Sequence, residues 1–132
     1  MKLMKYFETT SGTGVLATAD AAGKVDAAIY STPRVMDDGT VVFIMRERLM
    51  HENLRSNPFA AYLFLEDAPG HKGIRLYLKK TREDDNPALI ASMTRRHLTP
   101  EIDAQKGPKH LVYFVIEKIL PLIGSGEAQI TR

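Results

Sequence analysis

The residues best suited to bind a small anion are two arginines, Arg46 and Arg48, which lie between two regular segments. The segment before them, Val41 to Met45, is typical of a strand, and the segment after them, ending at Asn57-Pro58, is typical of a short helix. A helix N-terminus offers free backbone N–H groups and a positive dipole end, and arginine adds a planar fork of donors for phosphate oxygens. The pattern favours a phosphate site. The alternative is that both arginines lie on a solvated strand end.

Other kinds of chemistry find little support in the sequence. The absence of cysteine excludes disulfides, thiolate metal sites and a cysteine nucleophile. The four histidines, His51, His71, His97 and His110, have no ligand-like spacing, so we expect no metal site. No catalytic triad or carboxylate pair is apparent, and the catalytic residues stay unidentified. Any chemistry is therefore expected to come from a bound organic cofactor.

The size and composition are those of one globular domain spanning residues 1–132. The net charge of +2 is too small to indicate nucleic-acid binding. No apolar stretch approaches the length of a membrane span, and the first residues lack the features of a signal peptide. Together with the absence of cysteine, this leads us to expect a cytoplasmic protein that binds neither nucleic acid nor membrane.

Short strands joined by tight turns account for much of the chain. Strands are expected over residues 15–19, 25–31 (continuing through 35–36 after the break at Thr32-Pro33), 40–45, 59–65, 74–81 and 110–119. Helices are expected over 2–10, 49–56 and 87–97, the last capped by Asp84 or Asp85, and residues 11–14 are expected to interrupt regular structure. The early turns are too short for crossover helices, so the sequence predicts a mainly β protein, an antiparallel barrel with peripheral helices.

This order of elements resembles the FMN-binding split-barrel family, the pyridoxamine 5′-phosphate oxidase-like proteins. The resemblance rests on GVLATADAAGKVDAAIYSTP, on VMDDGTVVFIMRERLMHENLRSNPFAAYLFL, and on Asn53-Leu54 and Pro58 at the family's spacing. It covers about residues 12–82 and, loosely, 110–124. It implies a six-stranded antiparallel Greek-key split barrel, and a homodimer with FMN bound at the interface by residues of both chains.

The sequence departs from the family at one position that matters for the phosphate. Family members commonly carry a lysine three or four residues before the asparagine, where this chain has Met50 and Leu49. We expect Arg46 and Arg48 to supply the missing charge, with a contribution from His51. A pocket that has lost FMN stays open as the alternative.

The resemblance places the cofactor between two strands. The phosphate is expected at the end of the second one, and the isoalloxazine ring is expected against the segments Tyr30 to Arg34 and Phe43 to Met45. The alternative for Thr32-Pro33 is that it simply bends its strand. The expected FMN-binding residues are Ser31, Thr32, Arg34, Ile44, Met45, Arg46, Arg48, Leu49, His51 and Asn53.

The function expected from these features is an FMN-dependent oxidoreductase that passes hydride or electrons between small-molecule donors and acceptors. Two alternatives remain: a flavin-binding electron carrier or sensor without turnover of its own, and a split-barrel dimer without FMN. The sequence identifies neither the substrate nor the electron donor, and residues 83–109 have no assigned role.

Overall fold

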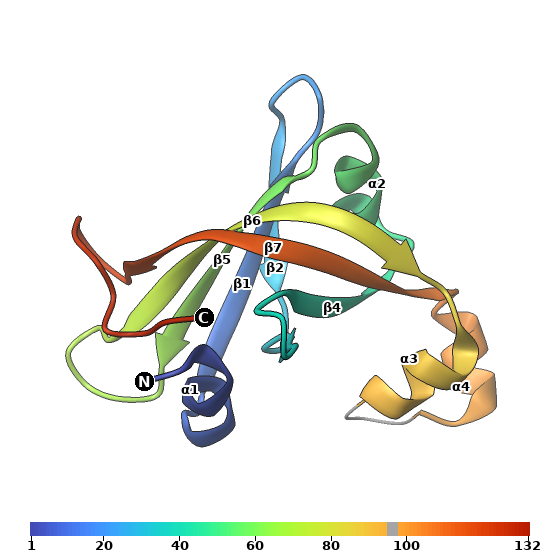
Figure 1. Ribbon diagram of the computed structural model, residues 1–132. Helices are drawn as coiled ribbons and strands as arrows, with labels where there is room; N and C mark the ends of the chain where they lie inside the picture. The colour runs from blue at the N-terminus through green and yellow to red at the C-terminus, as the bar shows by residue number, and fades with distance from the viewer. Residues whose placement is uncertain (95–97) are drawn as a thin grey trace.

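The described part of the chain folds into one strongly curved antiparallel sheet with four short helices at its margins (Figure 1). The computed structural model spans residues 1–132, of which the structure describes 1–94 and 98–132. Within these residues seven strands pair in the order β2-β1-β5-β6-β7-β4-β3. The expected mainly β, antiparallel architecture with peripheral helices is confirmed, whereas the expected number of six strands is wrong by one. The chain after Thr32-Pro33 does not continue its strand but forms a separate, two-residue strand that pairs with β4.

The elements follow the expected order closely. The strands are β1 Gly12–Ala19, β2 Val25–Ile29, β3 Arg34–Val35, β4 Val41–Arg46, β5 Phe59–Glu66, β6 Gly73–Asp84 and β7 Lys109–Pro121. The helices are α1 Leu3–Thr9, α2 Leu49–Ser56, α3 Pro87–Met93 and α4 Pro100–Gln105. The helix expected over 49–56 is confirmed residue for residue. Strand β6 is longer than expected because it remains paired with β7 as far as Asp84, and β7 is longer because it remains paired with β6 as far as Pro121.

The expected break at residues 11–14 is wrong, because β1 begins at Gly12 and pairs with β5 from there. The glycines allow close packing instead of a turn. A Cβ atom on Gly14 would collide with the hydroxyl of Tyr62, and it would lie 2.7 Å from the carbonyl oxygen of Tyr30. Tyr62 donates a hydrogen bond to that same carbonyl over 3.0 Å, so Gly14 makes room for a contact that ties β5 to the end of β2.

The helical segment after β6 also differs from expectation at its start. Asn86, and not Asp84 or Asp85, caps α3, because its side-chain oxygen accepts hydrogen bonds from the backbone N–H groups of Ala88 and Leu89. The helix ends at Met93, and the rest of the span expected to be helical, residues 95–97, lies outside the described residues. Thr99 caps α4 in the same way, through Ile102.

The core fills the inside of the curved sheet and is closed by helices. Its largest fully buried side chains include Tyr62, Phe64, Phe114 and Met45. Helix α1 contributes Leu3 and Tyr6 to this core, and α2 contributes Met50 and Leu54. The two chain ends meet, since the N–H of Leu3 donates to the carbonyl of Thr131 over 2.7 Å. None of the helices in the described part of the chain is long and apolar enough to cross a membrane.

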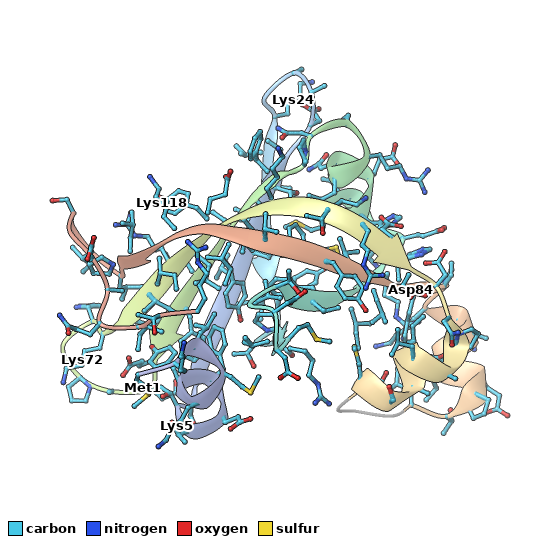
Figure 2. All side chains as sticks on the ribbon, viewed as in Figure 1. Met1, Lys5, Lys24, Lys72, Asp84 and Lys118 are labelled. Carbon is cyan, nitrogen blue, oxygen red and sulfur yellow. The ribbon has the colours of Figure 1, made fainter. Side chains whose placement is uncertain are left out.

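The α3–α4 segment projects from the sheet where β6 leads into β7. Asp84, labelled in Figure 2, marks the point at which the chain leaves β6. Figure 1 shows both helices beside the ends of β4 and β7 and away from the main body of the sheet. A smaller buried cluster, Val42, Ile90, Leu111 and Tyr113, joins α3 to the outer side of these strands. The segment is therefore held against the face of β4 that points away from the main core.

The contact made at Gly14 gives a direct test of the packing. We expect Gly14→Ala to lower the free energy of unfolding by about 1–3 kcal/mol, the usual cost of inserting a methyl group into a filled space. Thr13→Ala, on the exposed side of the same strand, is the control and should change stability by about 0.5 kcal/mol at most. Urea denaturation measures both. Equal stability of the two variants would contradict the packing described here.

Candidate functional site

A cavity of about 500 Å³ lies between the end of β2, the outer face of β4 and the α3–α4 segment. This volume is in the range typical of small-molecule and cofactor sites. The lining residues are Ile29, Tyr30, Ser31, Thr32, Arg34, Val42, Phe43, Ile44, Arg46, Met93, Thr94, Lys106 and Lys109. Five of the expected cofactor-binding residues are among them: Ser31, Thr32, Arg34, Ile44 and Arg46. The two segments expected to face the flavin ring thus border one cavity.

Strand alternation explains three of the four residues of β4 that line the cavity; the fourth, Phe43, is 2% exposed and belongs to the main core. Val42, Ile44 and Arg46 lie on the same side of the strand, since successive side chains point to opposite faces. Met45 lies on the other side and is 0% exposed, in the middle of the main core. Met45 therefore packs the core and does not line the cavity, although the sequence placed it with its neighbours.

Positive charge gathers along the cavity wall. Arg34, Arg46, Lys106 and Lys109 all line it, and they come from two parts of the chain that are far apart in sequence. A single carboxylate, Asp103, organises two of them. Its Oδ1 atom lies 2.7 Å from Nη2 of Arg46 and 3.0 Å from Nζ of Lys109.

Arg46 is held in place by more than this ion pair. Its Nη1 atom donates to the carbonyl oxygens of Asp103 and Gly107, so that the guanidinium joins β4 to the α4 turn. The hydrogen bonds from Arg46 and Lys109 lower the pKa of the Asp103 carboxyl below its ordinary value, and Asp103 is therefore ionised at neutral pH. The arrangement positions Arg46, and it also means that an added anion must compete with Asp103 for these two cations.

The contribution of residues 83–109 to the cavity was missed by sequence reasoning. This stretch supplies Met93, Thr94, Lys106 and Lys109 to the wall. The two lysines flank the turn at Gly107-Pro108, where a positive φ of 84° at Gly107 reverses the chain. Lysines on both sides of a Gly-Pro turn were the available signal, but nothing in the local pattern shows that the turn folds back onto β4.

The remaining expected residues divide into an exposed pair and a buried pair. Arg48 is the exposed N-cap of α2, and its side chain makes no capping hydrogen bond; Leu49 follows it with 57% exposure. Burial raises the pKa of the Tyr30 phenol, and the positive charge of Arg48 partly opposes that rise. Tyr30 lines the cavity, whereas neither Arg48 nor Leu49 is among the residues that line it.

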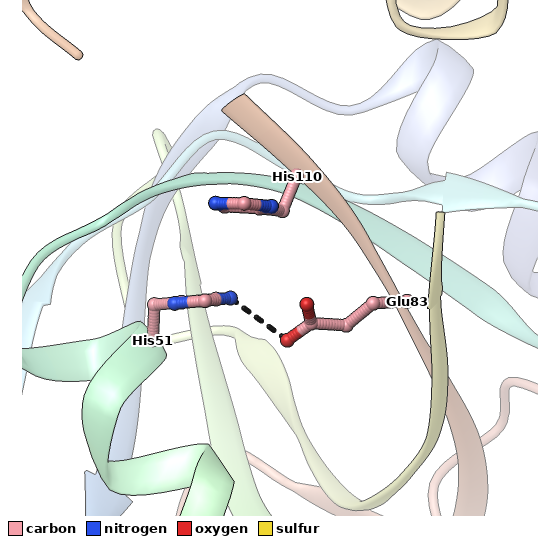
Figure 3. Close-up of side chains that lie close together, drawn as sticks. All are labelled: His51, Glu83 and His110. Carbon is pink, nitrogen blue, oxygen red and sulfur yellow. Dashed lines mark ion pairs between the residues drawn. The ribbon is translucent and has the colours of Figure 1, made fainter. Parts of the chain in front are cut away.

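The buried pair, His51 and Asn53, points into the protein. The Nδ2 atom of Asn53 donates to Oγ1 of Thr18 over 3.1 Å, and this hydroxyl contacts Sδ of Met50. Asn53 therefore fixes α2 against β1 and does not reach the cavity. His51 is 2% exposed and stacks on the ring of His110, with ring centroids 4.3 Å apart (Figure 3).

The His51–His110 pair belongs to a cluster that could hold a metal ion. Glu83 completes it, and one ligand atom from each of the three side chains lies within 4.8 Å of the others. Burial lowers the pKa of His110, but hydrogen bonds to Asp85 and Glu47 outweigh this effect and leave the pKa above its ordinary value.

Comparison with solved structures shows that other proteins share this fold. No protein-family model matches the chain, and no curated protein matches it. An FMN-binding protein from Syntrophomonas wolfei is 19% identical, with a TM-score of 0.74 over 95% of this chain and 86% of that one. An F420 reductase is 13% identical, with a TM-score of 0.69 over 90% of this chain and 97% of that one. A candidate pyridoxamine 5′-phosphate oxidase from Lactobacillus delbrueckii is 17% identical, with a TM-score of 0.64 over 89% and 88%. The split-barrel fold that the sequence resemblance implied is therefore confirmed.

The role of Asp103 can be tested apart from any ligand. We expect Asp103→Ala to speed amide hydrogen exchange across residues 100–108, because the α4 turn loses its ion pairs to Arg46 and Lys109. Glu101→Ala, an exposed acid on the same helix, is the matched control. Hydrogen exchange read by mass spectrometry measures both. Unchanged exchange in Asp103→Ala would show that the ion pairs do not hold the turn.

Proposed function

We propose that this split-barrel protein binds FMN in the cavity beside β4 and acts as an FMN-dependent oxidoreductase on small molecules. The observation that carries the proposal is the basic wall: four cationic side chains line one cavity that is bordered by the two segments expected to face a flavin. The comparisons support a fold used by flavoproteins. The cofactor, the substrate and the activity of this chain are the proposal.

The basic wall fits the phosphate of FMN. A phosphomonoester carries a charge of about −1.5 to −2 near neutral pH. Arg46, Lys106 and Lys109 can replace the lysine that family members carry where this chain has Met50 or Leu49. In this proposal Arg48, the exposed N-cap of α2, and the free backbone N–H groups of the first turn of that helix also contact the phosphate. The residues present therefore suit the group, even without the family's lysine.

The other walls suit a flat apolar ring. Ile29, Tyr30, Val42, Ile44 and Met93 supply apolar surface, and Ser31 and Thr32 supply hydroxyls at the rim. FMN, when bound, supplies hydride and electron transfer. The side chains named here would then bind and orient it, while the aliphatic residues keep water from one of its faces.

We further propose that the site is completed by a second copy of the chain. Ile29 lines the cavity with 69% exposure, and Val25 on the same strand is 80% exposed. Leu49, beside the expected phosphate position, is also largely exposed. Large exposed apolar side chains, one of which lines an open cavity, favour a surface that a partner covers. A homodimer that closes two such cavities covers them.

An electron carrier or sensor without turnover is the second candidate. The observation that favours it is the wall chemistry: the described residues lining the cavity include cations and hydroxyls but no histidine or carboxylate. Incubation of the flavin-loaded protein with reduced nicotinamide cofactor and an acceptor panel separates the candidates. Repeated turnover supports the oxidoreductase, and a single reduction per flavin supports the carrier. Purified protein that neither is yellow nor binds added FMN would overturn both.

The phosphate contact predicts a selective loss of affinity. We expect Arg48→Ala to weaken FMN binding by about tenfold to a hundredfold, because a charge-assisted hydrogen bond is worth about 1.5–3 kcal/mol and each 1.4 kcal/mol is tenfold. Riboflavin, which has no phosphate, should lose far less. Fluorescence quenching of each flavin measures the dissociation constants.

Arg55→Ala is the control for this measurement, because Arg55 is an exposed arginine in the last turn of the same helix. It should leave both affinities unchanged. Equal losses for FMN and riboflavin in Arg48→Ala would remove Arg48 from the phosphate site.

The ring position gives a separate prediction. We expect Ile44→Trp to fill the cavity and abolish binding of both FMN and riboflavin, while the partly exposed position lets the barrel fold. Substitution of Met45 is unsuitable for this purpose, because that side chain lies in the main core. Circular dichroism checks the fold, and flavin titration measures binding. A folded Ile44→Trp variant with full flavin affinity would place the ring elsewhere.

A further inference from the structure

We infer that His51, Glu83 and His110 form a binding site for a divalent transition-metal ion, of the zinc class, on the inner side of the sheet. This site is separate from the flavin cavity. It joins three elements, because His51 belongs to α2, Glu83 to the last part of β6, and His110 to the first part of β7 (Figure 3).

The separation of the two sites follows from the pairing of β4 with β7. Arg46 lies opposite Lys109, and both side chains line the flavin cavity. Met45 lies opposite His110, one residue along, and both are buried on the other side. Side chains directly opposite one another in an antiparallel pair share a face. His110 therefore points toward the barrel interior, where α2 brings His51 to meet it.

An unsatisfied buried nitrogen is the strongest sign of a ligand here. Among the described residues, Nε2 of His51 has no hydrogen-bond partner, although the side chain is almost completely buried. It lies 2.8 Å from Oε1 of Glu83, a distance that counts as an ion pair but lacks the alignment of a hydrogen bond. This nitrogen therefore has a charged neighbour but no aligned hydrogen bond, and a metal ion would give it a directed bond.

The surroundings of His110 are those of a metal ligand with an orienting carboxylate. Its Nδ1 atom lies 2.6 Å from Oδ1 of Asp85, and its Nε2 atom lies 3.0 Å from Oε1 of Glu47. Metal-bound histidines commonly hydrogen-bond through their second nitrogen to a carboxylate, which fixes the ring. Asp85 fills this role on Nδ1, so that Nε2 is the ligand atom. Glu47 on the same side can supply a further oxygen.

Glu83 can supply an oxygen ligand without losing its present contacts. Lys80 and His51 both approach its Oε1 atom, at 2.7 and 2.8 Å. In Figure 3 the second carboxylate oxygen points toward the side on which the His110 ring lies. The two imidazoles and one carboxylate then make a donor set of the kind that binds zinc and related first-row ions.

Metal binding requires one local rearrangement. The two imidazole rings are stacked within 10° of parallel, so their in-plane lone pairs lie in separate planes. One ring must turn about its Cβ–Cγ bond for both to reach the same ion. Ligand atoms around a zinc ion lie about 3.4 Å apart, given bonds of about 2.1 Å. The present separations of up to 4.8 Å call for an inward movement of about 1 Å.

Direct titration tests the site. The full chain, without a histidine tag and dialysed against a chelator, is titrated with Zn²⁺ by calorimetry. We expect one ion per chain, and we expect Glu83→Gln and His110→Gln each to weaken binding at least about tenfold. His71→Gln and Glu52→Gln, which alter an exposed histidine and an exposed acid outside the cluster, should bind as the unaltered protein does.

Two results would overturn the site: no saturable Zn²⁺ binding, or binding that Glu83→Gln and His110→Gln leave unchanged. A second measurement on the unaltered protein covers the case in which the variants do not fold. Paramagnetic Co²⁺ should selectively shift and broaden the ring signals of two histidines, those of His51 and His110, in the NMR spectrum. Effects centred on any other histidine would overturn the proposal as well.

Discussion

The pairing of β4 with β7 sets Arg46 opposite Lys109 and Met45 opposite His110. Because side chains alternate along both strands, Arg46 and Lys109 point outward, whereas the adjacent pair, Met45 and His110, points inward. A slip by one residue would exchange the two faces. It would bury charged side chains in the core and remove the basic wall. Both the cavity beside β4 and the histidine cluster therefore depend on the same backbone register.

The α3–α4 segment contacts the outward-facing cations that this register places side by side. Asp103 reaches back across the outward face and binds Arg46 and Lys109 together, which keeps two like charges close to each other at low cost. A phosphate placed between these cations would compete with Asp103 for the same donors. Binding there would weaken the hold on the α4 turn. Cofactor affinity and the position of this segment would then be linked, since each ion pair lost to Asp103 is offset by one gained by the phosphate.

The sequence predicted the parts of the fold that depend on local patterns. The helix over 49–56 follows from apolar spacing and the stop at Asn57-Pro58, and the mainly β fold follows from short strands with tight turns. It could not show that Gly14 serves close packing against Tyr62, because only the folded sheet brings those residues together. For the same reason it missed Lys106 and Lys109 as cavity residues. Both lysines are far from β4 in the sequence, and only the folded connection between β6 and β7 brings them next to Arg46.

The histidine cluster is a second group of residues that are far apart in the sequence and that only the fold brings together. Sequence motifs for metal sites consist of ligands that are close together in the chain. His51, Glu83 and His110 instead belong to three different elements, α2, β6 and β7. What assembles them is the closure of the barrel end by α2, which is fixed in turn by the hydrogen bond from Asn53 to Thr18. His51 and Asn53 were predicted as cofactor ligands because Asn53 stands at the family's spacing and His51 could replace part of the charge of the family's lysine. In the fold the helix turns them inward, whereas Arg48 and Leu49 are exposed. One short helix thus turns His51 and Asn53 to the interior and leaves Leu49 exposed to solvent.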